Sequence, residues 1–211
     1  MKDIKVVCFD LDETLISHNS WLDLSLGLGM TPKEDTRLLK LYESGEITYE
    51  EWNDHVLAHY MKHDDATREG VTRILSKYTL NDGAREAVQY LREKDYELVL
   101  VSGSIDIIVS KVAHDLGITY AKANNTFEFD DTGKLVGIHT HGNDTIAKAE
   151  HLESFCDLLE VGMDECACIA DGFNDIEMFK RTGRGITFRG SRIESEAWKV
   201  IDSLNDIKNV L

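Results

Sequence analysis

The segment VVCFDLDET, residues 6–14, constrains the fold more than any other stretch of this 211-residue chain. Its apolar half predicts a short strand buried on both faces, as in an open α/β sheet. Ligands bind such a sheet beyond the carboxyl ends of its strands, which is where Asp10 and Asp12 lie. Because residues two apart in an extended chain share a side, both carboxylates are expected to face one point. Their mutual repulsion favours a bound hard cation such as Mg²⁺.

The charge balance argues against two classes of partner. The chain has 39 Asp and Glu against 23 Lys and Arg, a formal net charge of -16, so neither nucleic acid nor an anionic membrane is expected to bind. No apolar run approaches membrane length and no signal peptide is expected. Three of the four cysteines, Cys8, Cys166 and Cys168, lie in apolar runs and are predicted to fill the core. We therefore expect a reduced, cytoplasmic protein that acts as a monomer or a homodimer.

The pattern of periodicity divides the chain into two kinds of structure. Residues 15–79 show helix signals only, among them capping boxes that begin at Thr31 and Thr48. This segment is predicted to be a small all-helical insert. Strands and helices then alternate, which predicts a mostly parallel sheet with right-handed crossovers. The expected strands cover residues 96–101, 118–121, 165–170, 185–188 and 200–201, with a β-hairpin over residues 127–139.

Acidic residues follow two of the predicted strands. Asp10 is placed to attack a phosphorus atom as a carboxylate nucleophile, and Asp12 to exchange protons with the leaving group and then with water. Asp171 and Asp175 follow the strand predicted at residues 165–170 and offer further carboxylates to the cation. Asp-x-Asp alone is more often turn or cap chemistry. The spacing Asp-Gly-x-Asn-Asp after a buried strand is the stronger signal, because a core gains nothing from these residues.

Two other segments carry groups suited to an anion. Ser102 ends the strand predicted at residues 96–101, and its hydroxyl, with the amides of Gly103 and Ser104, could bind phosphate oxygens at a helix N-terminus. Lys148 lies on a predicted helix over residues 143–159 and could neutralise a transferring phosphoryl group. A Ser-Gly pair is usually a plain turn, and a lone lysine on a helix is usually solvated. The ordered set of such groups in one chain is what favours a catalytic site.

Together these segments resemble the four signature motifs of the haloacid dehalogenase superfamily. The resemblance rests on FDLDET at residues 9–14, Ser102, Lys148 and ADGFND at residues 170–175, and it extends through nearly the whole chain. It is greatest to the phosphoserine phosphatase branch. The resemblance implies a Rossmann-like, doubly wound α/β core, with a helical cap inserted after the first strand and a β-hairpin flap late in the core. The core would comprise residues 1–14 and 80–211, and the cap residues 15–79.

The same resemblance implies roles for individual residues. Asp10 would be the nucleophile and Asp12 the general acid and base. Mg²⁺ would be held by Asp10, the backbone carbonyl of Asp12 and Asp171, with Asp175 beside them. The phosphoryl group would be bound by Ser102, Gly103, Lys148 and Asn174.

The function that these observations favour is a Mg²⁺-dependent phosphomonoester phosphatase. It would act on a small phosphorylated metabolite through an aspartyl-phosphate, and phosphoserine is the first candidate substrate. A phosphotransferase or phosphomutase would use the same residues with a second hydroxyl in place of water. A protein phosphatase is disfavoured, because the predicted cap of some sixty residues excludes a bulky substrate. The non-enzymatic alternative is a metal-binding interaction domain.

Two contacts that phosphoserine phosphatases make with their substrate are not matched. The glutamate that binds the substrate amine aligns with Asn19, and the cap arginine that binds the carboxylate aligns with Val56. His18, His55 or Arg37 could substitute. The amino-acid part of the substrate is therefore less well supported than the phosphate chemistry.

The histidines and tryptophans of the predicted cap have structural explanations besides metal or substrate binding. His55, His59 and His63 recur every four residues, a spacing that can bind Zn²⁺ but more often marks a solvated helix face. Trp21 and Trp52 more often fill a core than stack on a substrate.

Overall fold

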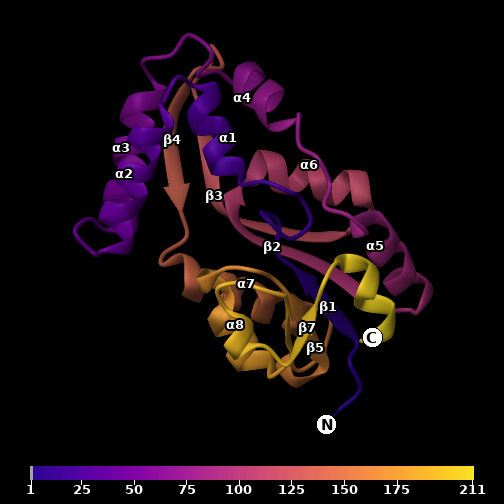
Figure 1. Ribbon diagram of the computed structural model, residues 1–211. Coiled ribbons are helices and arrows are strands. Elements are labelled where there is room, and N and C mark those ends of the chain that lie inside the picture. Colours follow the sequence, from indigo (N-terminus) through magenta and orange to yellow (C-terminus); the bar gives the residue numbers. More distant parts are fainter. Residues whose placement is uncertain (1) are drawn as a thin grey trace.

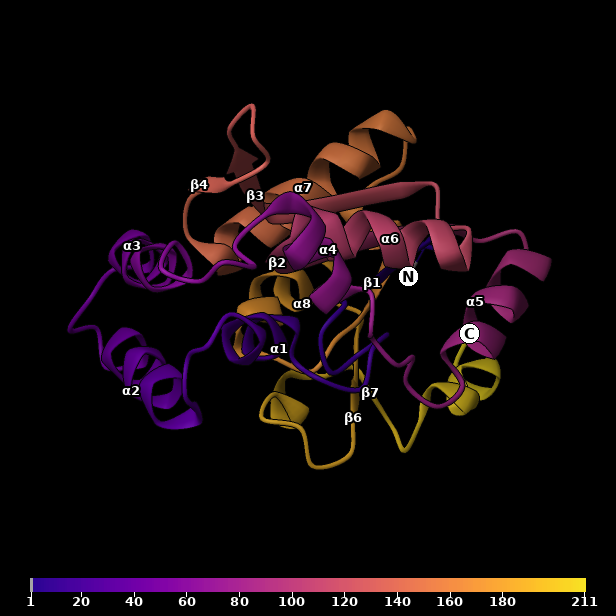
Figure 2. The same ribbon diagram turned by 90° about the horizontal axis from the view of Figure 1, so that it is seen from above.

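The computed structural model describes residues 2–211. Within them a seven-stranded sheet has the order β4-β3-β2-β1-β5-β6-β7, and helices cover both of its faces (Figures 1 and 2). Neighbouring strands are parallel, except that β4 is antiparallel to β3. This is the mostly parallel α/β sheet predicted from the sequence. Its strands are β1 (Val6–Phe9), β2 (Glu97–Ile105), β3 (Tyr120–Phe129), β4 (Leu135–Thr140), β5 (Cys166–Ile169), β6 (Gly185–Phe188) and β7 (Lys199–Ile201).

β1 is the central strand, and the strand order of the sheet reverses at it. It pairs with β2 on one side and with β5 on the other, so the chain builds outward from β1 both ways. At such a switch point the loops beyond the two neighbouring strands diverge and leave a crevice at the carboxyl edge. Asp10 directly follows β1, and its backbone amide still donates to the carbonyl of Ile169 at 2.9 Å. The topology therefore places Asp10 at the crevice.

Both faces of β1 are buried, as its apolar run predicted. Val7 and Phe9 belong to a core cluster with side chains of α5 (Ala84–Glu93) and α6 (Asp106–Leu116). Val6 and Cys8 belong to a second cluster, on the opposite face, formed largely with α7 (Asp144–Leu158) and α8 (Ile176–Thr182). Alternate residues thus pack against different helix layers, which fixes the register of the strand that carries Asp10.

Four helices occupy the chain between β1 and α5, and they lie together at one end of the molecule (Figure 1). They are α1 (Ser20–Gly27), α2 (Pro32–Glu43), α3 (Tyr49–Tyr60) and α4 (Arg68–Leu75). Capping boxes begin α2 at Thr31 and α3 at Thr48, as predicted. An antiparallel bridge between Ile16 and Leu80 brings the two ends of this helical segment side by side. That residues 15–79 form a domain of their own remains a prediction.

Two predicted element boundaries are wrong, and both errors involve β3. The strand expected to end before Ser102 continues to Ile105, because Ser102 and Ile105 pair with Ala123 and Asn125 of β3. The helix α6 accordingly begins only at Asp106. The short strand predicted at residues 118–121 and the first arm of the predicted hairpin are one strand, β3, which pairs in parallel with β2 and then antiparallel with β4.

The remaining sequence expectations concern the core and membranes. The four cysteines are buried and free, and Cys8, Cys166 and Cys168 fill the cluster under α7 and α8 as predicted. Short 3-10 turns connect the last elements, at Met163–Glu165, Phe173–Asp175, Glu194–Glu196 and Leu204–Asn209. None of the helices in residues 2–211 is long and apolar enough to cross a membrane.

The packing of α7 against the sheet is expected to contribute substantially to the free energy of unfolding. Leu152 of α7 is fully buried, whereas Leu158 of the same helix is 64% exposed. Leu152→Ala should lower the free energy of unfolding by about 2–5 kcal/mol, because it leaves a cavity under the helix. Leu158→Ala is the matched control and should change it by less than about 0.5 kcal/mol. Urea unfolding of the two variants measures both values, and equal losses would contradict this packing.

Candidate active site

Polar residues from three separate segments meet beyond the carboxyl end of β1. The Lys148 ammonium, on α7, lies 2.7 Å from Oδ1 of Asp10 and forms a second ion pair with Asp175. Lys148 and Asp175 are fully buried, and Asp10 is 5% exposed. Asp171 follows β5, and its carboxylate accepts a hydrogen bond from Thr14 at 3.3 Å. Residues that are far apart in sequence thus surround one buried lysine.

The charge of Lys148 depends on its acidic neighbours. Burial alone would disfavour the ammonium form, but the attraction of Asp10, Asp175 and Asp144 outweighs it and holds the pKa of Lys148 well above its usual value. A buried ammonium without such partners would be deprotonated. Lys148 is therefore a fixed positive charge that is in direct contact with Asp10.

Three carboxylates form a compact acidic group. Each of Asp10, Asp171 and Asp175 offers an oxygen that lies within 4.8 Å of the others, the single such grouping of three or more possible metal ligands found in residues 2–211. Oδ2 of Asp175 also accepts from the amide of Gly172 at 3.1 Å, which holds the loop closed around the group. A set of carboxylate oxygens without nitrogen or sulfur suits a hard divalent cation.

Asp12 lies beside this group but its carboxylate points elsewhere. It accepts from the backbone amide of Ser20 at 3.0 Å and from the Ser20 hydroxyl at 2.9 Å. Burial and the nearby charge of Asp10 raise the pKa of Asp12 to about 7. The Asp12 carboxylate is not part of the acidic group, so its predicted metal contact is left to its backbone carbonyl. A carboxyl group that is half protonated near neutrality can either give or take a proton.

The segment from Ser102 to Ser104 is built differently from the prediction. It lies on β2, so it is not the N-terminus of a helix, and the Ser104 amide is already used by a 3.0 Å bond to the Ser102 hydroxyl. The Gly103 carbonyl accepts from Trp21 of α1 at 3.2 Å and from Asn125 of β3 at 2.8 Å. The segment is therefore held by contacts from both the helical segment and the sheet.

Asp144 is a site residue that the sequence analysis missed. Its carboxylate accepts from Asn174 at 2.6 Å and from Asn124 at 2.9 Å, and the residue is 8% exposed. Asp144 stands one turn before Lys148 on α7, so the i, i+4 spacing of a helix puts both side chains on the same face. That spacing is the sequence signal that could have identified it.

The positions considered for the two unmatched substrate contacts either have other hydrogen-bond or ionic partners or are buried in the core. Asn19 caps α1 by accepting from the Leu22 amide at 3.0 Å, and His18 lies 3.0 Å from Asp23. Val56 is 1% exposed within the core cluster, which corrects its assignment as a substrate contact. Asn19 and Val56 were identified by alignment and His18 as a substitute, and neither choice shows which way a side chain points.

His55, His59 and His63 do not share one helix face. His55 is exposed on α3, but α3 ends at Tyr60, so His63 lies beyond the helix and does not share its face. The Nδ1 atom of His63 accepts from the Asp65 amide at 3.2 Å. Trp21 and Trp52 pack edge to face with ring centroids 5.0 Å apart, in agreement with a core role.

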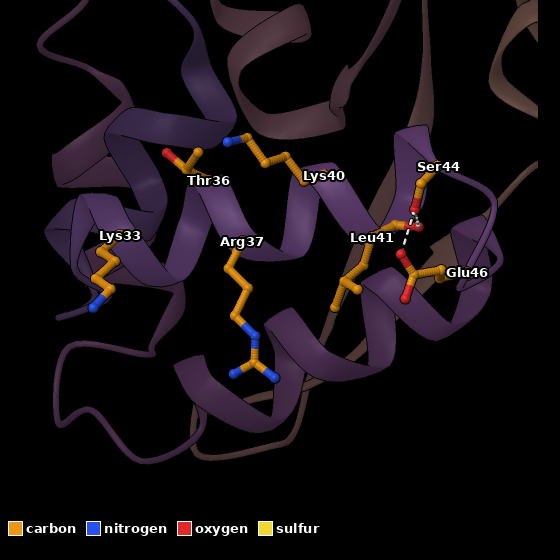
Figure 3. Close-up of a pocket in the computed structure, with 7 residues that line it drawn as sticks. All are labelled: Lys33, Thr36, Arg37, Lys40, Leu41, Ser44 and Glu46. Carbon is orange, nitrogen blue, oxygen red and sulfur yellow. Dashed lines mark hydrogen bonds between the residues drawn. The ribbon is translucent and has the colours of Figure 1, made fainter.

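Two grooves of the surface lie along α2. One of about 580 Å³ is lined by residues of α2 and of the turn after it, including Arg37, and none of its lining residues belongs to the acidic group (Figure 3). A second, of about 620 Å³, lies between α2 and the side chains of Phe173 and Arg192. Phe173 belongs to the same loop as Asp171 and Asn174.

Comparisons with known proteins agree with this geometry. A model of the haloacid dehalogenase-like hydrolases matches residues 4–183. The chain belongs to this family. Phosphoserine phosphatase from Methanocaldococcus jannaschii is 28% identical over all of this chain and 97% of its own length, and that from Campylobacter jejuni subsp. doylei is 28% identical over 99% and 98%. The family resemblance inferred from the four motifs is thereby confirmed.

Solved structures of the family share the fold along its whole length. A phospho-aspartyl intermediate analogue of phosphoserine phosphatase superposes with a TM-score of 0.84 at 27% identity, and covers 100% of both chains. A substrate-bound phosphoserine phosphatase complex gives the same TM-score, identity and coverage. The Rossmann-like core predicted from the resemblance is confirmed by these neighbours.

The buried carboxylates make a specific prediction for the dependence of stability on pH. Burial, with repulsion from Asp10, raises the pKa of Asp12 and of Asp171 to about 7, well above the value of about 3.9 in an unfolded chain. Between these values the folded state binds more protons than the unfolded state, so raising the pH removes stability. In EDTA, the Tm should fall as the pH rises from about 5 to about 7.

Addition of a divalent cation is the control for this experiment. A cation bound by Asp10 and Asp171 favours their ionised forms, so the fall in Tm between these pH values should largely disappear. A Tm in EDTA that stays constant or rises over the same interval would contradict the shifted pKa values of Asp12 and Asp171.

Proposed function

We propose that this hydrolase is a Mg²⁺-dependent phosphomonoester phosphatase that acts on a small metabolite through an aspartyl-phosphate on Asp10. The observation that carries the proposal is the buried Lys148 ammonium, 2.7 Å from the Asp10 carboxylate and beside Asp171 and Asp175. This arrangement pairs a nucleophile with a fixed positive charge where a phosphoryl group would be transferred. The phosphoserine phosphatases among its relatives support the proposal.

In the first step an oxygen of Asp10 attacks phosphorus and the bond from phosphorus to the ester oxygen breaks. Lys148 offsets the negative charge that Asp10 and the phosphoryl group bring together. The leaving oxygen takes the proton of Asp12, whose pKa of about 7 keeps it partly protonated at neutral pH. The Ser20 amide and hydroxyl hold the Asp12 carboxyl in place for this transfer.

In the second step water attacks the phosphorus of the aspartyl-phosphate. The ionised Asp12 takes a proton from this water, the bond between Asp10 and phosphorus breaks, and inorganic phosphate leaves. Asp10 is restored as a carboxylate in contact with Lys148. Asp12 is protonated again, so the two steps return both aspartates to their starting state.

The donor set fits Mg²⁺. Asp10, Asp171 and the backbone carbonyl of Asp12 would hold the ion, with Asp175 beside them, and all of these donors are oxygens. When bound, the ion supplies positive charge to the phosphoryl oxygens. Ser102, Gly103 and Asn174 are proposed to bind the same oxygens.

The helical segment is proposed to act as a cap. Residues 15–79 would form a domain over the crevice and limit the site to small substrates. Trp21 of α1, which donates to the Gly103 carbonyl, supports a direct link between this segment and the phosphate site. Phosphoserine or a close analogue is the first candidate substrate, because the relatives that match this chain along its length are phosphoserine phosphatases.

Substitution of Asp12 should separate the two steps. With an aryl phosphate, whose leaving group needs little protonation, Asp12→Asn should still transfer the phosphoryl group to Asp10. Hydrolysis of the aspartyl-phosphate should then be slow, because no base activates water. Acid quenching with labelled substrate should therefore trap covalently labelled Asp12→Asn protein, while phosphate release falls by about 10²–10⁴-fold.

Asp10→Asn should neither be labelled nor turn over, with a loss on the order of 10⁴-fold or more. Asp164→Asn, at an exposed aspartate that pairs with Lys2, is the matched control and should keep full activity. EDTA should abolish release and added Mg²⁺ should restore it. Labelling that survives in Asp10→Asn would refute the proposed nucleophile.

A further inference from the structure

The Asp144 carboxylate borders two of the residues proposed to bind phosphate. Oδ2 accepts from the side chain of Asn174 at 2.6 Å. On its other side the carboxylate lies against Gly103, where an added Cβ would stand only 2.6 Å from Oδ1. Only a glycine at position 103 leaves room for this carboxylate. A phosphoryl group bound by Gly103 and Asn174 would therefore have a buried negative charge next to it.

Asp144 forms no salt bridge with a lysine or arginine of residues 2–211, although the charge of Lys148, one turn away on α7, attracts it. Its two hydrogen-bond donors, Asn124 and Asn174, are neutral amides. The buried lysine and arginine side chains in residues 2–211 are Lys148, which is paired with Asp10 and Asp175, and Arg184, which donates to the carbonyl of Lys2. Asp144 takes part in none of the salt bridges among the described residues. Burial raises the pKa of Asp144, and a cation from outside the chain would favour its ionised form.

The surroundings of Asp144 hold an excess of hydrogen-bond acceptors. Asn124 is 2% exposed and uses its amide nitrogen for Asp144, while its Oδ1 has no hydrogen-bond partner among the described residues. A buried amide oxygen beside a buried carboxylate is suited to a group that donates several hydrogens. A primary ammonium satisfies both needs, because it carries a positive charge and three donors.

Aromatic side chains of the helical segment face the same region. Burial, and after it the negative charge of Asp144, raises the pKa of Tyr42 and of Tyr49. The Tyr49 ring is stacked on Trp52 with centroids 5.7 Å apart, and the Tyr49 hydroxyl accepts from Asn125 at 2.9 Å. This contact lies one residue from Asn124 in β3.

We propose that Asp144 binds a primary ammonium group of the substrate and so selects amine-bearing phosphomonoesters. This inference rests on the phosphatase function proposed above. The substrate would place its phosphoryl group at Asp10 and its ammonium between Asp144 and the free amide oxygen of Asn124. An ester without the cation would leave its phosphate beside a carboxylate that has no salt bridge. Selection then arises from attraction to the ammonium and from repulsion of substrates that lack it.

A matched pair of substrates isolates this contact. Phosphoethanolamine and 2-hydroxyethyl phosphate differ only in an ammonium against a hydroxyl. The wild-type protein with Mg²⁺ should favour phosphoethanolamine by about 10- to 100-fold in kcat/KM, as expected for a buried charge-assisted hydrogen bond. Asp144→Asn should reduce this ratio to near one. Asp106→Asn, at another first-turn aspartate that accepts from the backbone amide of Phe127, is the matched control and should leave the ratio unchanged.

The ratio of kcat/KM for the two substrates shows whether Asp144 binds the substrate ammonium or only positions Asn174. If Asp144 only orients Asn174, Asp144→Asn will slow both substrates equally and the ratio will persist, which would overturn the proposal. Phosphocholine should be a poorer substrate than phosphoethanolamine, because its quaternary nitrogen has no hydrogen to donate. Equal rates for these two would also count against the ammonium contact.

Binding of non-hydrolysable analogues tests the proposal without turnover. By calorimetry with Mg²⁺, wild-type protein should bind 2-aminoethylphosphonate about 10- to 100-fold more tightly than ethylphosphonate. Equal affinities would overturn the Asp144 contact even if the protein is an active phosphatase. Selective binding without hydrolysis of any phosphomonoester would support the contact and refute the phosphatase function. The two hypotheses therefore fail under different results.

Discussion

The candidate site depends on one buried ammonium surrounded by carboxylates. Lys148 is fully buried, and the attraction of Asp10 and Asp175 holds it charged. Removal of either partner would leave an unpaired charge in the interior, which costs several kcal/mol. The fold therefore has to bring α7 and the loop after β5 to the end of β1 in one fixed arrangement.

The sheet topology provides that arrangement. β1 lies between β2 and β5, and the crevice at its carboxyl end receives side chains from both directions of winding. The helix α7 packs through Leu152 on the face of β1 that carries Val6 and Cys8, and this contact aims Lys148 at Asp10. Packing and chemistry are thus coupled, because the residues that pack α7 against the sheet also determine where the Lys148 ammonium lies.

Much of the site could be predicted from strand ends. Asp10, Asp171 and Asp175 follow apolar runs that had to be central strands, and parallel strands end at the same edge. The residues Ser102 to Ser104 were harder, because a Ser-Gly-Ser sequence favours a turn and only pairing with β3 keeps it extended. Asp144 was missed because an aspartate in the first turn of a helix is usually explained by the helix dipole. The buried position of Val56 and the position of His63 beyond α3 were missed, since neither the orientation of a helix in residues 15–79 nor its last residue is determined by local sequence.

The most direct test of this account is a crystal structure of the protein soaked in Mn²⁺, with anomalous scattering used to locate the ion. The account predicts one strong peak bounded by the carboxylates of Asp10 and Asp171, at about 2.0–2.3 Å from their oxygens, with Lys148 still in contact with Asp10. A peak at another place on the molecule, or Lys148 turned away from Asp10 in an ordered site, would contradict it.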